Sequence, residues 1–177
     1  MKVSREQVAE NRRLILDAAA RLFRDRGIDG VTVAQIMAAA GLTHGAFYGH
    51  FKSKDDLVAQ ACAHALPASR EDVVIADYAA AYLSGEHRDN RGGGCVFAAL
   101  GSEAVRGGAD MRRTLTAAVR AQLDRLTRTA PGKTPAARRQ AAITAWAAMV
   151  GAVTLARLVD DETLSDEILD ATKAGLG

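Results

Sequence analysis

Residues 27–56, GIDGVTVAQIMAAAGLTHGAFYGHFKSKDD, decide how this chain folds. Two short runs of helix-forming residues are separated by a turn at Gly41, and a basic step at residues 52–54 leads into a third run. Two helices joined by so tight a glycine turn form a helix-turn-helix, whose second helix can enter the major groove of DNA. The stretch therefore predicts a unit that binds double-stranded DNA.

Capping patterns predict where these helices begin and end. Thr32, with Gln35 three residues later, is a capping box, so a helix is expected to start directly after Thr32. Gly41 follows this helix and can take the left-handed conformation that ends it. Thr43 can then cap a second, short helix that reaches about His50.

The second short helix has an apolar face and a polar face. Phe47 and Phe51 are four residues apart, so they share the face that we expect to be buried. Each glycine in a helix costs about 1 kcal/mol relative to alanine, so a helix used only for packing would gain by replacing it. Either the backbone must lie close to DNA here, or the glycines mark an irregular loop. The polar face consists of His44, Gly45, Tyr48 and Gly49.

These residues resemble the N-terminal domain of the TetR/AcrR family of bacterial transcriptional regulators. The similarity covers GIDGVTVAQIMAAAGLTHGAFYGHFKSKDDL at residues 27–57 and is clearest in FYGHFKSKDDL. It extends back through the first helix, over about the first third of the chain. A further segment, RGGGCVFAALGSE at residues 91–103, is similar to one branch of the family. The remainder resembles the family only in its helical layout.

The resemblance implies a division of the chain and a set of DNA contacts. Residues 1–53 would form the helix-turn-helix DNA-binding domain, and residues 54–177 a helical ligand-binding and dimerisation domain. No base contact is expected from the first of the two helices, because it presents Val33 and Ala34 where some relatives carry a polar or cationic side chain. Base edges would be contacted by His44, Gly45 and Ala46. Phosphates would be contacted by Thr32, Thr43, Tyr48, His50 and Lys54.

The composition agrees with an all-α fold. Of 177 residues only 5% are aromatic and three are proline, and no run alternates polar and apolar residues with the period of a strand. We expect about nine helices. A net charge of +2 is too small to indicate nucleic acid by itself, although basic side chains outnumber acidic ones over residues 1–26.

Hydrophobic periodicity, capping residues and helix breakers place the other helices. Ser4 starts the first helix, and Thr134, followed by proline, starts the longest one. Ser53 starts the helix after the helix-turn-helix, and Pro67 ends it. A polar, glycine-rich loop is expected over residues 85–94. The helices expected after the helix-turn-helix span about 54–66, 70–84, 95–106, 111–129, 135–159 and 164–175.

Small residues recur at helical spacing along the longest expected helix. Such a stripe lets another helix approach closely, either within the chain or from a second subunit. The family resemblance implies that helices eight and nine, at 135–159 and 164–175, pair with their copies in a homodimer. The two helix-turn-helix domains of the dimer, here called reading heads, would then lie about 34–36 Å apart and bind a palindromic operator. The stripe consists of Ala141, Ala145, Ala148, Ala152 and Ala156.

The resemblance also implies a small-molecule effector of unknown identity, bound in an apolar cavity of the larger domain. Its binding would shift the population away from the DNA-bound form, so the chain is expected to be a repressor that a ligand releases. No cofactor is expected. Each candidate for the lining can equally be plain core. The candidates are Tyr78, Tyr82, Phe97, Met111, Leu115, Trp146 and Met149.

Cys95 follows three glycines and is expected in the first turn of a helix, with Arg88 and Arg91 just upstream. A helix N-terminus and nearby cations lower the pKa of a thiol and make it more reactive. Cys95 is therefore either a sensor for oxidants and electrophiles or a small buried residue. Cys62 lies on an apolar stripe and is expected to serve packing. Two cysteines make neither a disulfide framework nor a metal site.

Other functional classes have little support in the sequence. The four histidines are scattered, no Ser-His-Asp or paired-carboxylate pattern is visible, and the glycines at 92–94 lack the lysine of a phosphate-binding loop, so no enzyme is expected. The polar N-terminus lacks an apolar signal segment, and no membrane span is expected, although residues 141–159 come closest. These features indicate a cytoplasmic protein. The alternative to a ligand-controlled regulator is an architectural DNA-binding protein without a ligand.

Overall fold

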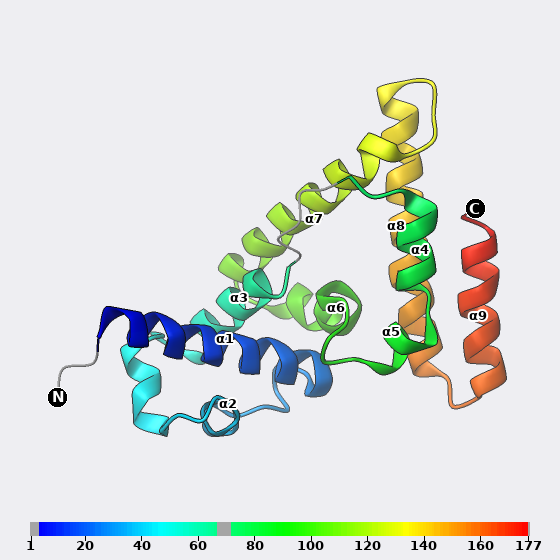
Figure 1. Cartoon of the computed structure of the whole chain (residues 1–177). Helices are drawn as coiled ribbons and strands as arrows, with labels where there is room; N and C mark the ends of the chain where they lie inside the picture. The colour runs from blue at the N-terminus through cyan, green and yellow to red at the C-terminus, as the bar shows by residue number, and fades with distance from the viewer. Residues whose placement is uncertain (1–3, 67–71, 177) are drawn as a thin grey trace.

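A computed structural model of the chain describes residues 4–66 and 72–176, and within these ranges every regular element is helical (Figure 1). The all-α prediction is confirmed. The elements are α1 (Arg5–Arg26), α2 (Val33–Ala39), the 3₁₀ helix η1 (His44–Gly49), α3 (Lys54–His64), α4 (Ile75–Tyr82), α5 (Gly85–Asp89), α6 (Val96–Arg106), α7 (Ala109–Thr129), α8 (Pro135–Leu158) and α9 (Glu162–Ala174).

Most of the predicted helix starts carry the hydrogen bonds expected of them. The Thr32 hydroxyl accepts from the backbone N–H of Gln35 at 3.2 Å, and the Gln35 side chain accepts from the Thr32 N–H at 2.9 Å. Ser4, Ser53 and Thr134 cap α1, α3 and α8 in the same way. Gly41 has a φ of 70°, the left-handed conformation predicted for the turn.

Three details of the sequence analysis need correction. Thr43 precedes η1 but makes no capping hydrogen bond with its side chain. The segment from His44 to Gly49 is a 3₁₀ helix, which suits a run of only six residues with two glycines. Residues 85–94 are not all loop, because the Ser84 hydroxyl accepts from the His87 N–H and starts α5. The predicted stop at Pro67 lies outside the described residues, and α3 ends before it at His64.

Two apolar clusters make up the interior. The first joins α1, α2, η1 and α3 to the inner face of α6, with Phe23, Ile36 and Leu57 among its fully buried side chains. The second joins α4, α7, α8 and α9 and includes Leu126 and Met149. Phe97 on α6 packs against both clusters. The reading head and the larger helical part therefore share α6 as a common wall.

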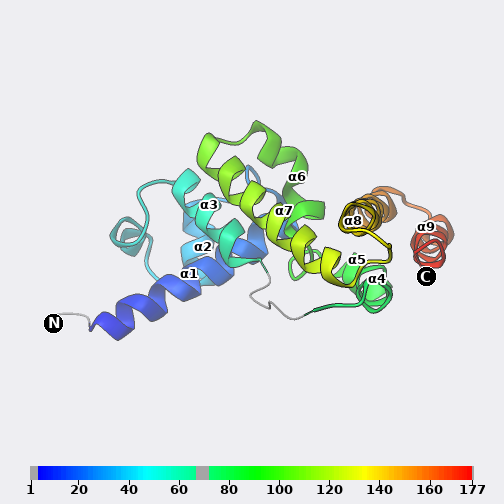
Figure 2. The same ribbon diagram turned by 90° about the horizontal axis from the view of Figure 1, so that it is seen from above.

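The helices lie in a triangular arrangement around α6. In Figure 1, α7 runs from the neighbourhood of α3 to the loop at residues 130–134, and α8 returns from there, while α1 crosses the base. Viewed from above in Figure 2, α8 and α9 lie at the far end of the molecule from α2 and η1. α3 packs on both α1 and α7, so it belongs to both parts. The division at residues 53 and 54 stays a prediction.

α8 is the one helix within residues 4–66 and 72–176 that is both long and apolar. By length and composition alone it could cross a membrane. It contacts α4, α5, α6, α7 and α9, which is the environment of the central helix of a folded core. Packing inside the chain therefore buries part of the apolar surface that the sequence shows at 141–159, and the rest stays exposed in the single chain.

Candidate nucleic-acid interface

η1 is held against the first core by one aromatic face. Phe47 and Phe51 are 2% and 3% exposed, and their rings stack with centroids 5.7 Å apart. The Arg12 guanidinium lies 4.9 Å from the centre of the Phe51 ring, which ties the segment directly after η1 to α1. The predicted burial of this face is confirmed.

The opposite face of η1 is free. Tyr48 is 72% exposed, and its ring meets Phe47 edge to face at 5.2 Å and His44 at 6.2 Å. Thr43, His44 and Gly45 are exposed as well, and Ala46 is half-buried. The structure thus exposes His44 and Gly45 to solvent together with Tyr48, whereas Ala46, the third predicted base-contacting residue, packs partly against the first cluster.

The two glycines of η1 are not explained by the chain itself. A Cβ atom added to Gly45 or Gly49 would meet nothing within 4 Å, and neither residue has a positive φ. Intrachain packing and backbone conformation would both accept alanine, which favours helix more strongly. Close approach of a partner to the backbone is a remaining reason for glycine at these positions. This supports the interpretation that the backbone of η1 lies close to DNA.

The predicted phosphate contacts lie at both ends of the helix-turn-helix. Thr32 is exposed at the start of α2, while His50 and Lys54 are half-buried where η1 leads into α3. The Lys52 N–H donates to the Asp56 carboxylate at 2.9 Å, and this bond, followed by one from Gln60, holds the pKa of Asp56 below its ordinary value. The step between η1 and α3 is therefore fixed by an ionised carboxylate.

Comparison with known proteins decides what kind of helix-turn-helix this is. Residues 15–61 match the family described as bacterial regulatory proteins, tetR family. The chain carries a TetR-family DNA-binding domain. It is 42% identical over 57 residues to the transcriptional regulator AcrR of Shigella flexneri, covering 32% of this chain and 26% of that protein. It is 45% identical over 56 residues to the transcriptional repressor Rv1474c of Mycobacterium tuberculosis, covering 32% and 30%.

These matches span less than a third of either curated relative, whereas the likeness of fold to solved structures covers nearly the whole chain. The reduced form of Escherichia coli NemR superposes with a TM-score of 0.72 at 20% identity, covering 94% of each chain. A TetR-family regulator from Cytophaga hutchinsonii superposes with a TM-score of 0.75 at 18% identity, covering 99% and 96%. At such identities the likeness establishes the fold alone.

One hydrogen bond that the sequence analysis missed links the TetR-family domain to the larger helical part. The Glu103 carboxylate on α6 accepts from the Ile28 backbone N–H at 2.7 Å, directly after Gly27 ends α1. The two residues are 75 positions apart, so no local pattern could have paired them. A movement of α6 would therefore displace the backbone at Ile28, where the segment that leads into α2 begins.

The candidate effector residues fall into both clusters. Tyr78, Tyr82, Trp146 and Met149 lie in or against the second cluster, and Phe97 meets Trp146 edge to face at 5.0 Å. Burial raises the pKa of Tyr78 to about 12 and raises that of Tyr82 further, so both hydroxyls stay neutral. Met111 and Leu115 instead pack against the first cluster, near the start of α7.

Cys95 is half-buried and precedes α6 as its N-cap residue, not within the first turn as predicted. The cations expected beside it are engaged elsewhere, because Arg88 binds Asp89 and Asp166 and Arg91 lies 3.6 Å from Asp25. Two other cations flank the glycines before it. Arg24 donates to the Gly94 carbonyl at 3.2 Å, and Arg157 donates to the carbonyls of residues 87 and 88.

Cys62 is buried on α3, and this burial raises the pKa of its thiol to about 11. The neutral thiol predominates at physiological pH, and thiols react as thiolates. The structure agrees with a packing role for Cys62.

His87 makes stability depend on pH. Its Nδ1 lies 2.6 Å from the Tyr82 carbonyl oxygen and its Nε2 accepts from the Cys95 N–H at 3.1 Å, so the ring is neutral with the proton on Nδ1. Burial lowers the pKa of His87 from the ordinary 6.5, against the opposing effect of the Tyr82 carbonyl. As the pH falls below about 6.5 the unfolded chain takes up this proton before the folded chain does, so the free energy of unfolding decreases.

We therefore expect His87→Gln to reduce the loss of stability between about pH 7 and pH 5. Urea unfolding at a series of pH values measures it. An identical pH slope in the variant and the natural chain would show that His87 is not the group responsible.

The predicted stripe of alanines on α8 does not face outward. Ala145, Ala152 and Ala156 are buried within the chain, and Ala141 and Ala148 are half-buried. A different stripe is exposed on α8, because α7 and α9 leave one side of it uncovered. It consists of Ile143, Ala147, Gly151, Leu155 and Leu158, with Leu155 and Leu158 55% and 72% exposed.

Proposed function

We propose that the chain is a cytoplasmic transcriptional regulator, most simply a repressor, that binds a palindromic operator as a homodimer and is released by a small molecule. The observation that carries the proposal is the exposed face of η1. A TetR-family helix-turn-helix whose aromatic face is buried offers Tyr48, His44 and Gly45 to a partner.

In this proposal η1 enters the major groove and α3 borders the phosphate strand. His44 can donate or accept at a base edge, and Gly45 and Ala46 let the backbone approach it. Thr32, Thr43, Tyr48, His50 and Lys54 contact phosphates and fix the orientation without reading sequence. With few direct base contacts, part of the specificity comes from the shape of the DNA.

The homodimer is proposed to form through α8 and α9. Ile143, Ala147, Gly151 and Leu155 are spaced four residues apart, so they lie along one side of α8. A Cβ atom on Gly151 would meet no atom of the described residues within 4 Å, so a second helix can approach closely there. An exposed apolar stripe of this kind is typical of a subunit interface.

The effector is proposed to act through the contacts between the two parts of the chain. α3 packs on α7, and Glu103 on α6 holds the backbone of Ile28. A ligand that favours one position of α6 and α7 over another shifts the population of reading-head spacings. A spacing that no longer fits two half-sites releases the operator.

The test is footprinting of the full chain on the promoter of its own gene, followed by titration of the protected segment at several salt concentrations. A single protected palindrome, bound at least about 1,000-fold more tightly than unrelated duplex, is expected. Equal affinity for all duplexes, with no response to any small molecule, would favour the alternative of an architectural DNA-binding protein. Failure to bind duplex DNA at low salt would refute both.

The sensor role of Cys95 is a second proposal, supported by partial exposure of the residue and by Arg24 and Arg157 beside it. Treatment with a mild electrophile such as N-ethylmaleimide is expected to release the operator, and Cys95→Ser is expected to abolish that release while it leaves DNA affinity unchanged. Fluorescence anisotropy of labelled operator measures both. Equal release from the variant would end the proposal.

A further inference from the structure

The second apolar cluster contains a buried arginine that has no carboxylate partner among the described residues. Arg125 on α7 is 8% exposed, and within residues 4–66 and 72–176 it has no carboxylate partner. Its guanidinium lies 5.3 Å from the centre of the Tyr78 ring and interacts with the Tyr78 hydroxyl, but its Nε is buried without a hydrogen-bond acceptor. A neutral hydroxyl does not balance the charge, and a charge taken out of water without an opposite charge costs several kcal/mol, so the free chain keeps this arginine at the expense of stability.

The surrounding side chains show the same imbalance. The Gln122 amide nitrogen, the Trp146 indole N–H and the Tyr82 hydroxyl are also buried without a partner among the described residues. They come from α7, α8 and α4, and all of them can donate a hydrogen bond. Buried polar groups in folded proteins are nearly always paired, so several unsatisfied donors on helices of the same cluster as a buried cation favour an acceptor from outside the chain.

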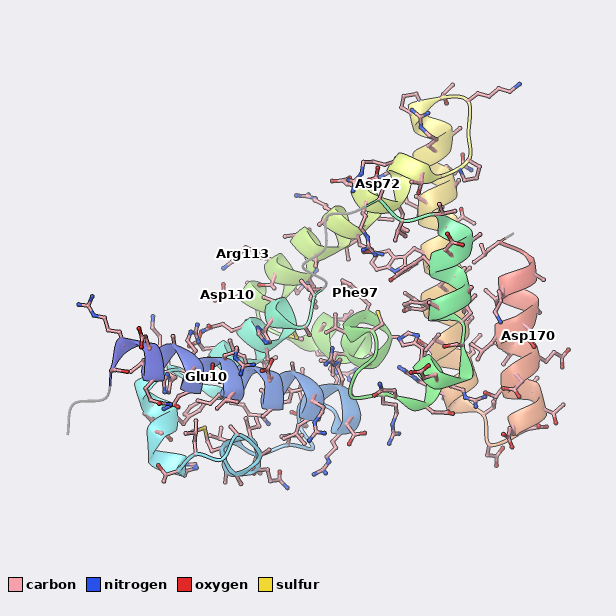
Figure 3. The ribbon with its side chains drawn as sticks, viewed as in Figure 1. Glu10, Asp72, Phe97, Asp110, Arg113 and Asp170 are labelled. Carbon is pink, nitrogen blue, oxygen red and sulfur yellow. The ribbon has the colours of Figure 1, made fainter. Side chains whose placement is uncertain are left out.

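The side chains that pack beside these donors are aromatic and apolar. Tyr78 and Tyr82 lie 5.5 Å apart, and Phe97 packs against Trp146. Figure 3 shows Phe97 in the middle of the molecule, between α6 and the facing helices. An apolar lining with a few convergent polar groups is typical of a small-molecule site, here with donors and one positive charge.

We infer that the second core binds an organic anion whose carboxylate pairs with Arg125 and whose apolar or aromatic body lies among Tyr78, Phe97 and Trp146. The planar guanidinium can hold a carboxylate by two parallel hydrogen bonds. This inference deepens the proposed function, since the anion would be its effector, and it was not visible in the sequence, where Arg125 is one of many arginines.

The first measurement needs no ligand. Arg125→Met keeps the length and apolar character of the side chain but removes the unpaired charge, so the denaturation midpoint of the free protein is expected to rise. Arg120→Met is the matched control, because Arg120 is an exposed arginine on the same helix, and its midpoint should stay nearly unchanged. A lower midpoint for Arg125→Met would mean that the arginine has a structural role, and it would overturn the inference.

The second measurement is calorimetric titration of the full chain with decanoate and naphthoate, each beside its neutral carboxamide. The natural chain should bind at least one carboxylate roughly 10- to 100-fold more tightly than its amide, and Arg125→Met should lose that preference. Equal binding of acid and amide, no binding of either acid, or an unchanged preference in the variant would overturn the inference.

Operator DNA separates this inference from the proposed function. DNA binding without any carboxylate binding would leave the proposed function standing and overturn the inference. Carboxylate binding through Arg125 by a chain that does not bind DNA would support a carboxylate site and refute the proposed function.

Discussion

Replacing Leu155 and Leu158 together by lysine is expected to turn the dimer into a monomer and to lower operator affinity by about 100- to 10,000-fold. The two side chains lie at the end of the exposed apolar stripe of α8 and are 55% and 72% exposed in the single chain. Two charges buried there without partners oppose association. Operator binding then loses the gain that comes from linking two reading heads.

The control for this variant is Val105→Lys. Val105 is 75% exposed, like Leu158, and both residues lie at the C-terminal end of a helix, where a positive charge is favourable. Sedimentation gives the oligomeric state and anisotropy gives the DNA affinity. A double variant that remains dimeric at micromolar concentration would contradict the α8 interface, and a monomeric Val105→Lys would point to another surface.

Tyr48→Ala is expected to weaken binding by roughly 100-fold on operator and on unrelated duplex alike. A hydroxyl that donates to a charged phosphate contributes about 1.5 kcal/mol or more, and a dimer loses two such bonds. Because phosphate contacts carry no sequence information, specific and non-specific affinity should fall by similar factors. The folded chain should be little affected, since the side chain is 72% exposed.

Tyr48→Phe separates the hydroxyl from the ring. If the phosphate bond is the source of the effect, the phenylalanine variant should weaken binding nearly as much as the alanine variant. Titration at several salt concentrations is the measurement for both. A loss confined to the operator would instead make Tyr48 a base-reading residue, contrary to the proposal.

Local patterns predicted the helix-turn-helix well, because its helix starts, its turn and its buried face each depend on residues a few positions apart. The capping box of Thr32 and Gln35, the left-handed Gly41 and the shared face of Phe47 and Phe51 all act within five residues. The predicted helix type of η1 was wrong: the segment is a 3₁₀ helix, a form that is common in short pieces and that local patterns do not distinguish from a short α-helix. The start of α5 was missed because a loop-like composition hid the Ser84 cap.

The sequence alone therefore determined the all-α fold, the helix-turn-helix and the residues it exposes, since helical period, capping and glycine conformation are properties of neighbouring residues. Only the tertiary structure decided which side of α8 is exposed to solvent, which cations lie near Cys95, and that Arg125 has no carboxylate partner among the described residues. Each of these depends on helices far apart in the chain. Burial and pairing are fixed by what packs against a residue, and a side chain's own neighbours in sequence do not specify that.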